Sequence, residues 1–397
     1  MIASALRRLT FTLIGVGLAL VLAEGVLQLM PRAPWRDRLE IGYPWLEYDP
    51  TLGWVNRPGF RQQEFGINAL GFRGQEAEAR KRPEVLRIVC LGDSRTFGIR
   101  RDFNGFQYDN DYPEMLGAML SNAAGATPAE VVNAGVIGYT SAQGLRQLVL
   151  QILSLHPDIV VVAFGFNDHS PAWKPALASH EPKNSLARAA FYTLAPLRVF
   201  QLGESVYQAI SAVSAAPFSV PWVDEQEYAY NLRRLAEVAR EHGIPILLLS
   251  QGLRSLELGD SLPSAGDALQ PRDEYGLLGV KTLAELHQVD ERYRAILARV
   301  SRELRLPVAD AVAAFAAHRD EPLFSRYDLV HPNPAGARLI AETLLHRMQE
   351  LGWLTLPEGH AGARPNAASG SNWSADGRDR REVLDRPRND VQGSKVP

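Results

Sequence analysis

A serine and an aspartate–histidine pair are the residues of this chain whose types and spacing could perform nucleophilic chemistry. Ser94 follows the apolar run 85–91 in the sequence Gly-Asp-Ser, and Asp328 and His331 lie three residues apart just before a helix pattern. This separation lets the carboxylate reach Nδ1 of the imidazole, which leaves Nε2 free to accept a serine proton. Gly-Asp-Ser alone most often forms a structural turn, and a phosphate-binding turn of the flavodoxin kind would look similar. The prediction of a nucleophile therefore depends on the fold bringing Ser94 to His331.

Two loops between these residues carry groups that could receive negative charge. Gly138 precedes a helix whose start is indicated by the capping-box pair Thr140 and Gln143, and a loop at a helix N-terminus exposes free backbone N–H groups. Asn167 follows another apolar run and offers a side-chain amide as a further donor, while Asp168 could brace the same loop. Glycine, asparagine and aspartate are also the residues that ordinary turns prefer. The loops can stabilise an oxyanion only if they meet Ser94.

The elements that must position these residues follow an alternating pattern. Short apolar runs typical of buried strands are separated by segments with helical periodicity, which predicts a parallel sheet covered on both faces. We expect a single three-layer α/β domain over residues 85–352, with its ligand site beyond the carboxyl ends of the strands. The predicted strands are 85–91, 130–133, 158–164, 244–250 and 307–309, and the predicted helices are 141–155, 224–242, 288–305 and 334–351.

Taken in order, these blocks resemble those of the SGNH, or GDSL-like, hydrolase superfamily. The serine, glycine, asparagine and histidine of its name correspond to Ser94, Gly138, Asn167 and His331, and Asp328 matches the aspartate of its Asp-x-x-His block. The resemblance implies a three-layer α/β/α sandwich with a mostly parallel, flavodoxin-like five-stranded sheet. It also implies catalysis by Ser94, Asp328 and His331. The implied oxyanion hole is formed by the backbone N–H groups of Ser94 and Gly138 and by the Asn167 amide.

The function that this resemblance implies is a serine-dependent ester hydrolase, of the esterase or carbohydrate deacetylase type, acting through an acyl-serine intermediate. The expected substrate bears an ester, on an acylated saccharide or a lipid, and no metal or organic cofactor is required. Two alternatives stay open: an O-acyltransferase that modifies an envelope or exopolysaccharide sugar, and a non-catalytic, membrane-tethered carbohydrate-binding or assembly component. Arg95, where relatives more often carry a small or apolar residue, is expected to bear on substrate shape.

The first 31 residues predict an association with a membrane. From Leu9 to Met30 the only charged residue is Glu24, and this run spans about 33 Å at helical rise, enough to cross a bilayer core. Arg7 and Arg8 precede it. We predict an uncleaved anchor in preference to a signal peptide cleaved before Glu24, because the apolar stretch continues past that point. The body is then expected on the extracytoplasmic side, periplasmic or extracellular. Cleavage would instead make the protein secreted.

Composition gives expectations for the remaining segments. Residues 32–84 form a connecting collar rich in Pro, Gly, Arg and aromatics, and its stretches "EYDPTLGWVNRPGF" and "GINALGFRG" resemble membrane-anchored SGNH proteins of bacterial envelopes. The insertion 169–223 has an apolar middle, which predicts extra packed helices or, alternatively, a lid or membrane-facing segment. Residues 353–397 are polar and are expected to form a disordered tail. A net charge of −3 predicts no nucleic-acid partner, the single cysteine, Cys90, is expected in the core, and no oligomeric state is indicated.

Overall fold

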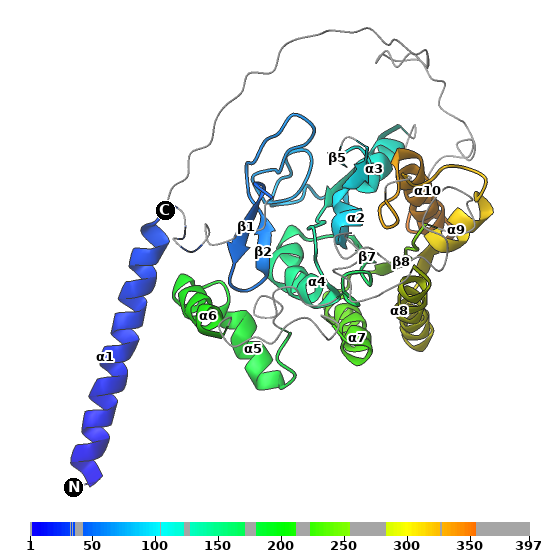
Figure 1. Ribbon diagram of the computed structural model, residues 1–397. Coiled ribbons are helices and arrows are strands. Elements are labelled where there is room, and N and C mark those ends of the chain that lie inside the picture. The colour runs from blue at the N-terminus through cyan, green and yellow to red at the C-terminus, as the bar shows by residue number, and fades with distance from the viewer. Residues whose placement is uncertain are drawn as a thin grey trace, which may run out of the picture. The chain divides into compact units, whose positions relative to one another are not determined.

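The computed structural model describes residues 2–31, 33, 35, 43–103, 105–122, 128–170, 180–211, 223–254, 283–325 and 328–354 (Figure 1). Within them, five strands form one sheet in the order β6-β3-β7-β8-β9, and every neighbouring pair is parallel. This is a flavodoxin-like strand order, so the predicted fold class is confirmed. The strands are β3 (Leu86–Gly92), β6 (Ala129–Asn133), β7 (Ile159–Ala163), β8 (Ile246–Ser250) and β9 (Val308–Asp310).

The sheet is buried on both faces because its side chains alternate between two apolar clusters. Val89 and Leu91 of β3 belong to one cluster, while Ile88 and Cys90 belong to the other, and Cys90 is a fully buried core thiol as predicted. Helices supply much of the rest of each cluster. The first cluster draws on α4 (Ser141–Gln147), α7 (Glu225–Glu241) and α8 (Leu283–Leu304), and the second on α3 (Tyr112–Asn122), α9 (Ala311–Ala317) and α10 (Pro334–Glu350).

The predicted helices are present, with two differences. The segment 141–155 is α-helical only to Gln147, then forms a π-helical turn over Leu148–Ile152 and a 3-10 turn over Leu153–Leu155. Helix α8 begins at Leu283, earlier than its sequence pattern indicates. Helix α10 begins as predicted, because the Asn333 side chain accepts a hydrogen bond from the N–H of Gly336 at 3.0 Å and Pro334 occupies the first turn.

The described part of the collar belongs to the same core as the sheet. It contains the antiparallel pair β1 (Leu46–Asp49) and β2 (Gly53–Asn56), and most of its buried aromatic residues join the first apolar cluster. Trp54 Nε1 donates to the carbonyl of Ile137 at 2.8 Å, and Asn56 Nδ2 donates to the carbonyl of Gly135 at 3.0 Å. The collar therefore contacts the loop that leads from β6 into α4.

The chain also has an apolar N-terminal helix, an insertion and a polar C-terminal segment. Helix α1 (Ile2–Leu29) is long and apolar enough over Ser4–Leu29 to cross a membrane, by length and composition, and a signal sequence would have the same properties. The insertion contains α5 (Ser185–Leu194) and α6 (Arg198–Ser211), while its segments 171–179 and 212–222 lie outside the described residues. Of the predicted tail, only Trp353 and Leu354 are described, and Leu354 packs in the second apolar cluster.

Candidate active site

Ser94 lies at the carboxyl end of β3, an interior strand of the sheet, in a turn too tight for most residues. It is the first residue of α2 (Ser94–Phe97), and Asp93 caps this short helix by accepting a hydrogen bond from the N–H of Arg95 at 2.9 Å. A Cβ atom on Gly92 would stand 2.1 Å from Oγ1 of Thr96. The glycine of Gly-Asp-Ser is therefore required by the close approach of strand and helix, and the turn sets Ser94 at the edge of the sheet.

The structure brings the three residues of the predicted catalytic group together. Ser94 Oγ lies 2.9 Å from His331 Nε2, and His331 Nδ1 lies 2.9 Å from Asp328 Oδ2. The serine and histidine are 237 residues apart in the chain, so the contact depends on the whole sheet being assembled. Asp328 is buried and Ser94 is 9% exposed, while His331 is partly exposed. The geometry links one hydroxyl, one imidazole and one carboxylate in a line.

The Asp328 carboxylate is held by several donors. Its Oδ1 accepts from the N–H groups of Val330 and His331, both at 2.9 Å, and its Oδ2 accepts from the N–H of Arg101 at 2.8 Å. Burial by itself would raise the pKa of Asp328, but the facing His331 and the backbone donors outweigh it and lower the pKa overall. The carboxylate is therefore ionised beside the imidazole at neutral pH.

Gly138 and Asn167 lie on neighbouring loops that are bonded to each other. Gly138 has φ +79°, and a Cβ atom there would come within 3.2 Å of the Trp54 ring. Asn167 Nδ2 donates to the carbonyl of Tyr139 at 3.0 Å, which uses one of its two N–H bonds. In the part of the chain that the structure describes, the backbone N–H groups of Ser94 and Gly138 have no protein acceptor. These free donors are of the kind that can receive an anionic oxygen.

Asp168 braces the two loops, as its position in the sequence suggests. Its Oδ1 accepts from the backbone N–H of Ser141 at 3.0 Å and from the Ser141 hydroxyl at 2.5 Å, which ties the end of β7 to the start of α4. Burial raises the pKa of Asp168 to about 7, even though the bonds from Ser141 oppose this shift. Asn231 of α7 donates to the same hydroxyl at 2.9 Å. The loop that carries Asn167 is thus held by bonds between Asp168 and the start of α4, which α7 supports through Asn231.

Arg95, which was expected to bear on substrate shape, has its side chain in the protein interior. Its side chain is only 3% exposed, pairs with the Asp93 carboxylate at 3.2 Å and lies over the ring of Phe166. The residue is therefore buried under the serine turn and is not at the surface of the site. A direct effect of Arg95 on substrate shape does not follow from this position, and its contact is with the cap of α2.

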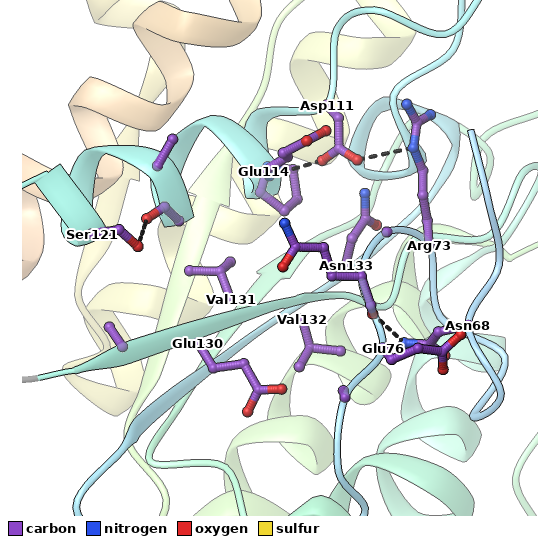
Figure 2. A pocket seen from close by; sticks show the side chains of 17 residues that line it. Asn68, Arg73, Glu76, Asp111, Glu114, Ser121, Glu130, Val131, Val132 and Asn133 are labelled. Carbon is purple, nitrogen blue, oxygen red and sulfur yellow. Dashed lines mark hydrogen bonds and ion pairs between the residues drawn. The ribbon is translucent and has the colours of Figure 1, made fainter. Parts of the chain in front are cut away.

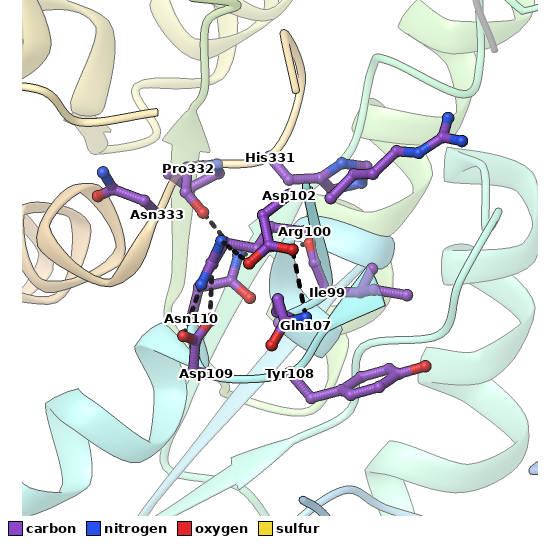
Figure 3. A network of polar contacts seen from close by, with 12 residues as sticks. Ile99, Arg100, Asp102, Gln107, Tyr108, Asp109, Asn110, His331, Pro332 and Asn333 are labelled. Atoms are coloured by element: carbon purple, nitrogen blue, oxygen red, sulfur yellow. Dashed lines mark hydrogen bonds and ion pairs between the residues drawn. The ribbon is translucent and has the colours of Figure 1, made fainter. Parts of the chain in front are cut away.

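The hairpin beside His331 was not predicted from the sequence. Strands β4 (Arg100–Asp102) and β5 (Gly105–Gln107) pair antiparallel, and the backbone N–H of Arg101 donates to Asp328. Asn110 Nδ2 donates to the carbonyl of Pro332 at 2.8 Å and so holds the histidine loop from the same side (Figure 3). The signal was present as Asn-Gly at positions 104–105, which is typical of a tight hairpin turn. Phe103, which is 81% exposed, stands at this turn.

A hollow of about 310 Å³ lies away from the serine, along the edge strand β6. Arg73, Asp111, Glu114, Glu130 and Asn133 are among its lining residues, while Ser94 and His331 are not (Figure 2). Among the residues that the structure describes, no group of three or more His, Cys, Asp and Glu side chains is placed to hold a metal ion. The serine, histidine and aspartate group therefore lies outside this hollow.

A doubly wound parallel sheet with a serine, a histidine and an aspartate linked at its carboxyl edge is the arrangement of a serine acyl hydrolase. Residues 90–339 match the model of the GDSL-like Lipase/Acylhydrolase family, and the chain belongs to this family. It is a serine ester hydrolase of the SGNH or GDSL type. The matched region contains the serine turn, both donor loops and the aspartate–histidine pair. It does not contain the collar.

Solved structures give weaker similarity, and no curated protein matches the chain. A lipase/acylhydrolase from Enterococcus faecalis is 16% identical, with 69% of this chain and 100% of that chain covered and a TM-score of 0.42. An acetylxylan esterase from Geobacillus stearothermophilus is 17% identical, with 66% and 94% covered and a TM-score of 0.40. An α/β hydrolase from the metagenome of Lake Arreo, Spain, is 18% identical, with 66% and 95% covered and a TM-score of 0.40.

Proposed function

We propose that Ser94 is the nucleophile of this ester hydrolase, with His331 as its general base and Asp328 as the group that orients the base. The observation that supports this most directly is the continuous line from Ser94 Oγ through both ring nitrogens to the carboxylate, with 2.9 Å at each junction. Because the ionised Asp328 accepts at Nδ1, the tautomer with the proton on Nδ1 is favoured. That tautomer leaves the Nε2 lone pair directed at the serine hydroxyl.

The reaction that these groups support is acyl transfer in two steps. His331 Nε2 takes the Ser94 proton as Oγ attacks the ester carbonyl, and the oxyanion is received by the N–H groups of Ser94 and Gly138 and by the second N–H of Asn167. The protonated imidazole then gives its proton to the leaving alkoxide, and an acyl-serine remains. Water, deprotonated by the same imidazole, attacks this ester and releases the acid and the free serine.

The experiment that tests the nucleophile is labelling of the full chain with a fluorophosphonate probe. The probe forms a bond to an activated serine oxygen, so we expect wild-type protein to be labelled and Ser94→Ala to lose both labelling and turnover of a short-chain aryl ester. Ser121→Ala, which changes an exposed serine on α3, is the matched control and should behave as wild type. Labelling that persists in a folded Ser94→Ala protein would overturn the assignment.

The second-step acceptor that we propose is water, which makes the protein an esterase or a carbohydrate deacetylase. The ester is borne by an acylated saccharide or a lipid. The test is a product assay with an acetyl donor and a polysaccharide acceptor. Free acetate as the only product supports hydrolysis, whereas acetylated sugar above the hydrolysis background would show that a sugar hydroxyl is the acceptor and that the protein is an O-acyltransferase.

We propose further that α1 is retained as a membrane anchor with the catalytic domain on the extracytoplasmic side. Its length and apolar composition support a span, and its Glu24 is hydrogen-bonded to α6 of the folded body. The full chain is expected to stay in the membrane pellet after alkaline carbonate extraction. A reporter that is active only in the cytoplasm, fused to the C-terminus, should be inactive, and activity of that reporter would contradict the proposed side.

A further inference from the structure

Helix α6 of the insertion has the reverse of the usual surface pattern. The residues that it buries are polar, with Ser205 1% exposed and Gln208 5% exposed, whereas Tyr207 and Ile210 are 66% and 69% exposed. Every exposed position from 202 to 210 carries an apolar residue, glycine or tyrosine. We call this set the apolar face of α6, and it consists of Leu202, Gly203, Val206, Tyr207, Ala209 and Ile210. A helix in water normally shows the opposite arrangement, so this face is built for an apolar surrounding.

Helix α5 also exposes apolar residues, although its pattern is less regular. None of its residues is fully buried, and Leu186 and Leu194 are exposed together with several alanines. Its partly buried side holds Arg188, which faces the buried carboxylate of Glu181, and the aromatic residues Phe191 and Tyr192. Exposed apolar residues therefore lie on both helices of the insertion, and the ordered apolar face belongs to α6.

The start of α6 is fixed to the end of the apolar helix α1. The Glu24 carboxylate accepts from the backbone N–H of Arg198 at 3.1 Å and of Val199 at 2.8 Å, which are free donors at the start of α6. The Arg198 guanidinium donates to the carbonyls of Leu27 and Met30 at the end of α1, the latter at 2.6 Å. Glu24 of α1 is thus hydrogen-bonded to backbone groups of α6, and Arg198 of α6 to backbone groups at the end of α1.

The polar side of α6 is fixed to the collar, which sets the direction of the apolar face. Tyr48 Oη donates to Gln208 Oε1 at 2.7 Å, and Gln208 Nε2 donates to the carbonyl of Pro50 at 2.7 Å. Because these bonds are buried, the helix cannot turn its apolar face inward without breaking them. The outward direction of this face is therefore a property of the folded chain.

We propose that the apolar face of α6, together with the adjoining α5, lies in the headgroup–acyl boundary of the leaflet on the side of the catalytic domain. The occupant of this face is a lipid bilayer surface. This inference goes beyond ester hydrolysis and rests on α1 being a retained anchor. It assigns the insertion a second membrane contact, which holds the enzyme body against the bilayer and fixes its orientation.

Continuity with α1 is the reason that lipid is the favoured occupant. Glu24 is five residues before the end of α1, so its contact with α6 lies about 7.5 Å from that end at helical rise. An amphipathic helix at a bilayer surface buries its apolar side to a depth of about 5–10 Å. None of the apolar window of α1 is buried inside the protein, so one apolar medium would cover both helices.

The test places a fluorescent label on the apolar face in the full chain. Val206→Cys and Ile210→Cys are labelled with an NBD thiol reagent, and the protein is reconstituted in vesicles of phosphatidylethanolamine and phosphatidylglycerol. The native cysteine, Cys90, is fully buried, so the unsubstituted protein is the control for labelling. Arg338→Cys, on the exposed side of α10, is the matched control for a surface in water.

The proposal expects the labels at 206 and 210 to be quenched by lipids brominated near the headgroup and to show several-fold weaker iodide quenching than the label at 338. Iodide quenching equal to that at 338 would overturn it. Protection from iodide without quenching by brominated lipid would also overturn it, because a protein partner would then cover the face. A label at Leu18→Cys in α1 reports the anchor separately. If that label is not quenched by lipids brominated deep in the chains, the anchor itself is wrong, and ester turnover does not affect either readout.

Discussion

Every group that is hydrogen-bonded to the Asp328 carboxylate is a donor. Replacing one carboxylate oxygen with an NH₂ group should therefore disturb these bonds. An amide at this position must direct an NH₂ group at the backbone N–H groups of Arg101 or Val330, or at the His331 ring. Facing the ring, it would favour the tautomer with the proton on Nε2, which cannot accept from Ser94. We therefore predict that Asp328→Asn lowers kcat by about 10⁴-fold.

The measurement is the rate of aryl ester hydrolysis by Asp328→Asn in a preparation whose melting temperature shows that it is folded. Asp320→Asn, at an exposed position, is the matched control and should retain full activity. A loss smaller than tenfold would contradict the role of Asp328 in orienting the base.

Asn167 supports a second prediction at the scale of single residues. One of its amide N–H bonds is used by the Tyr139 carbonyl, so the other is the one available for an oxyanion. Because an oxyanion exists only in the transition state and the intermediate, removal of this donor should act on kcat and leave KM nearly unchanged. We predict that Asn167→Ala lowers kcat by about 10²–10³-fold. A rise in KM at constant kcat would instead indicate a role in binding the ground state.

At the scale of elements, the strands were predictable because buried strands have a recognisable pattern of apolar residues. A strand covered on both faces must be apolar at successive positions, so runs such as 158–164 stand out, and the observed β7 (Ile159–Ala163) lies within that run. The position of Ser94 at a strand end follows from this, whereas His331 reaches it from the loop before α10, and their catalytic roles remain predictions. The end of the helix predicted at 141–155 was wrong in detail, because apolar periodicity does not distinguish an α-helix from the π-helical turn at Leu148–Ile152.

The elements that escaped prediction are those whose fold depends on distant partners. Strands β4 and β5 are too short for a periodic pattern, and their place beside the site rests on the bond from Arg101 to Asp328. Helix α6 exposes its apolar residues. The usual assumption that apolar residues face the core would therefore assign the wrong face of this helix to the interior. The collar has few periodic segments, and its contacts with residues 135–143 join parts of the chain about eighty residues apart.

The backbone conformation of Gly138 supports a prediction about both stability and activity. Its φ of +79° is unfavourable for a residue with a side chain, and the added Cβ atom would press on the Trp54 ring at 3.2 Å. We predict that Gly138→Ala lowers the free energy of unfolding by about 1–2 kcal/mol and reduces activity, because the loop must shift its N–H. Gly117→Ala, in the middle of α3 and without a close contact, is the control and should be neutral or slightly stabilising. Unchanged kcat in Gly138→Ala would contradict the placement of this N–H in the oxyanion hole.

Asp168 links β7 to α4 and predicts a dependence of stability on pH. Its pKa is raised from 3.8 to about 7 in the folded protein, so between these values the folded state holds more protons than the unfolded state. The contribution to stability is therefore full at the acidic end of this window and is lost as the pH rises through it, by up to about 1.4 kcal/mol per pH unit. We predict that Asp168→Asn has a flatter dependence of melting temperature on pH across this window than wild type. Equal slopes in the two proteins would contradict the raised pKa.

At the scale of the whole molecule, the collar and the catalytic fold act as one structure. The family match begins at residue 90, yet Arg73 of the collar inserts its side chain against the turn that presents the serine. Its guanidinium donates to the carbonyls of Phe97 at 2.7 Å and Gly98 at 2.9 Å, at the end of α2, and pairs with Asp111 at 2.9 Å (Figure 2). Both members of the pair are buried, so each depends on the other for its charge.

We predict that Arg73→Met lowers the free energy of unfolding by about 3–5 kcal/mol, because it leaves the buried Asp111 carboxylate without its partner. Activity should fall as well, since α2 loses the donors that hold its last carbonyls. Burial already raises the pKa of Asp111 to about 6 against the effect of Arg73, so the cost of the substitution should be smaller below this pH, where the carboxyl group is neutral. The measurements are melting temperature and aryl ester turnover of the full chain on both sides of that pH.

The double variant Arg73→Met with Asp111→Leu separates the charge from the hydrogen bonds. It removes the unpaired carboxylate, so much of the lost melting temperature should return, while the carbonyls of Phe97 and Gly98 still lack a donor. Activity is therefore expected to recover less than stability does. If Arg73→Met has the melting temperature and the ester turnover of the wild type, the collar does not support the serine turn.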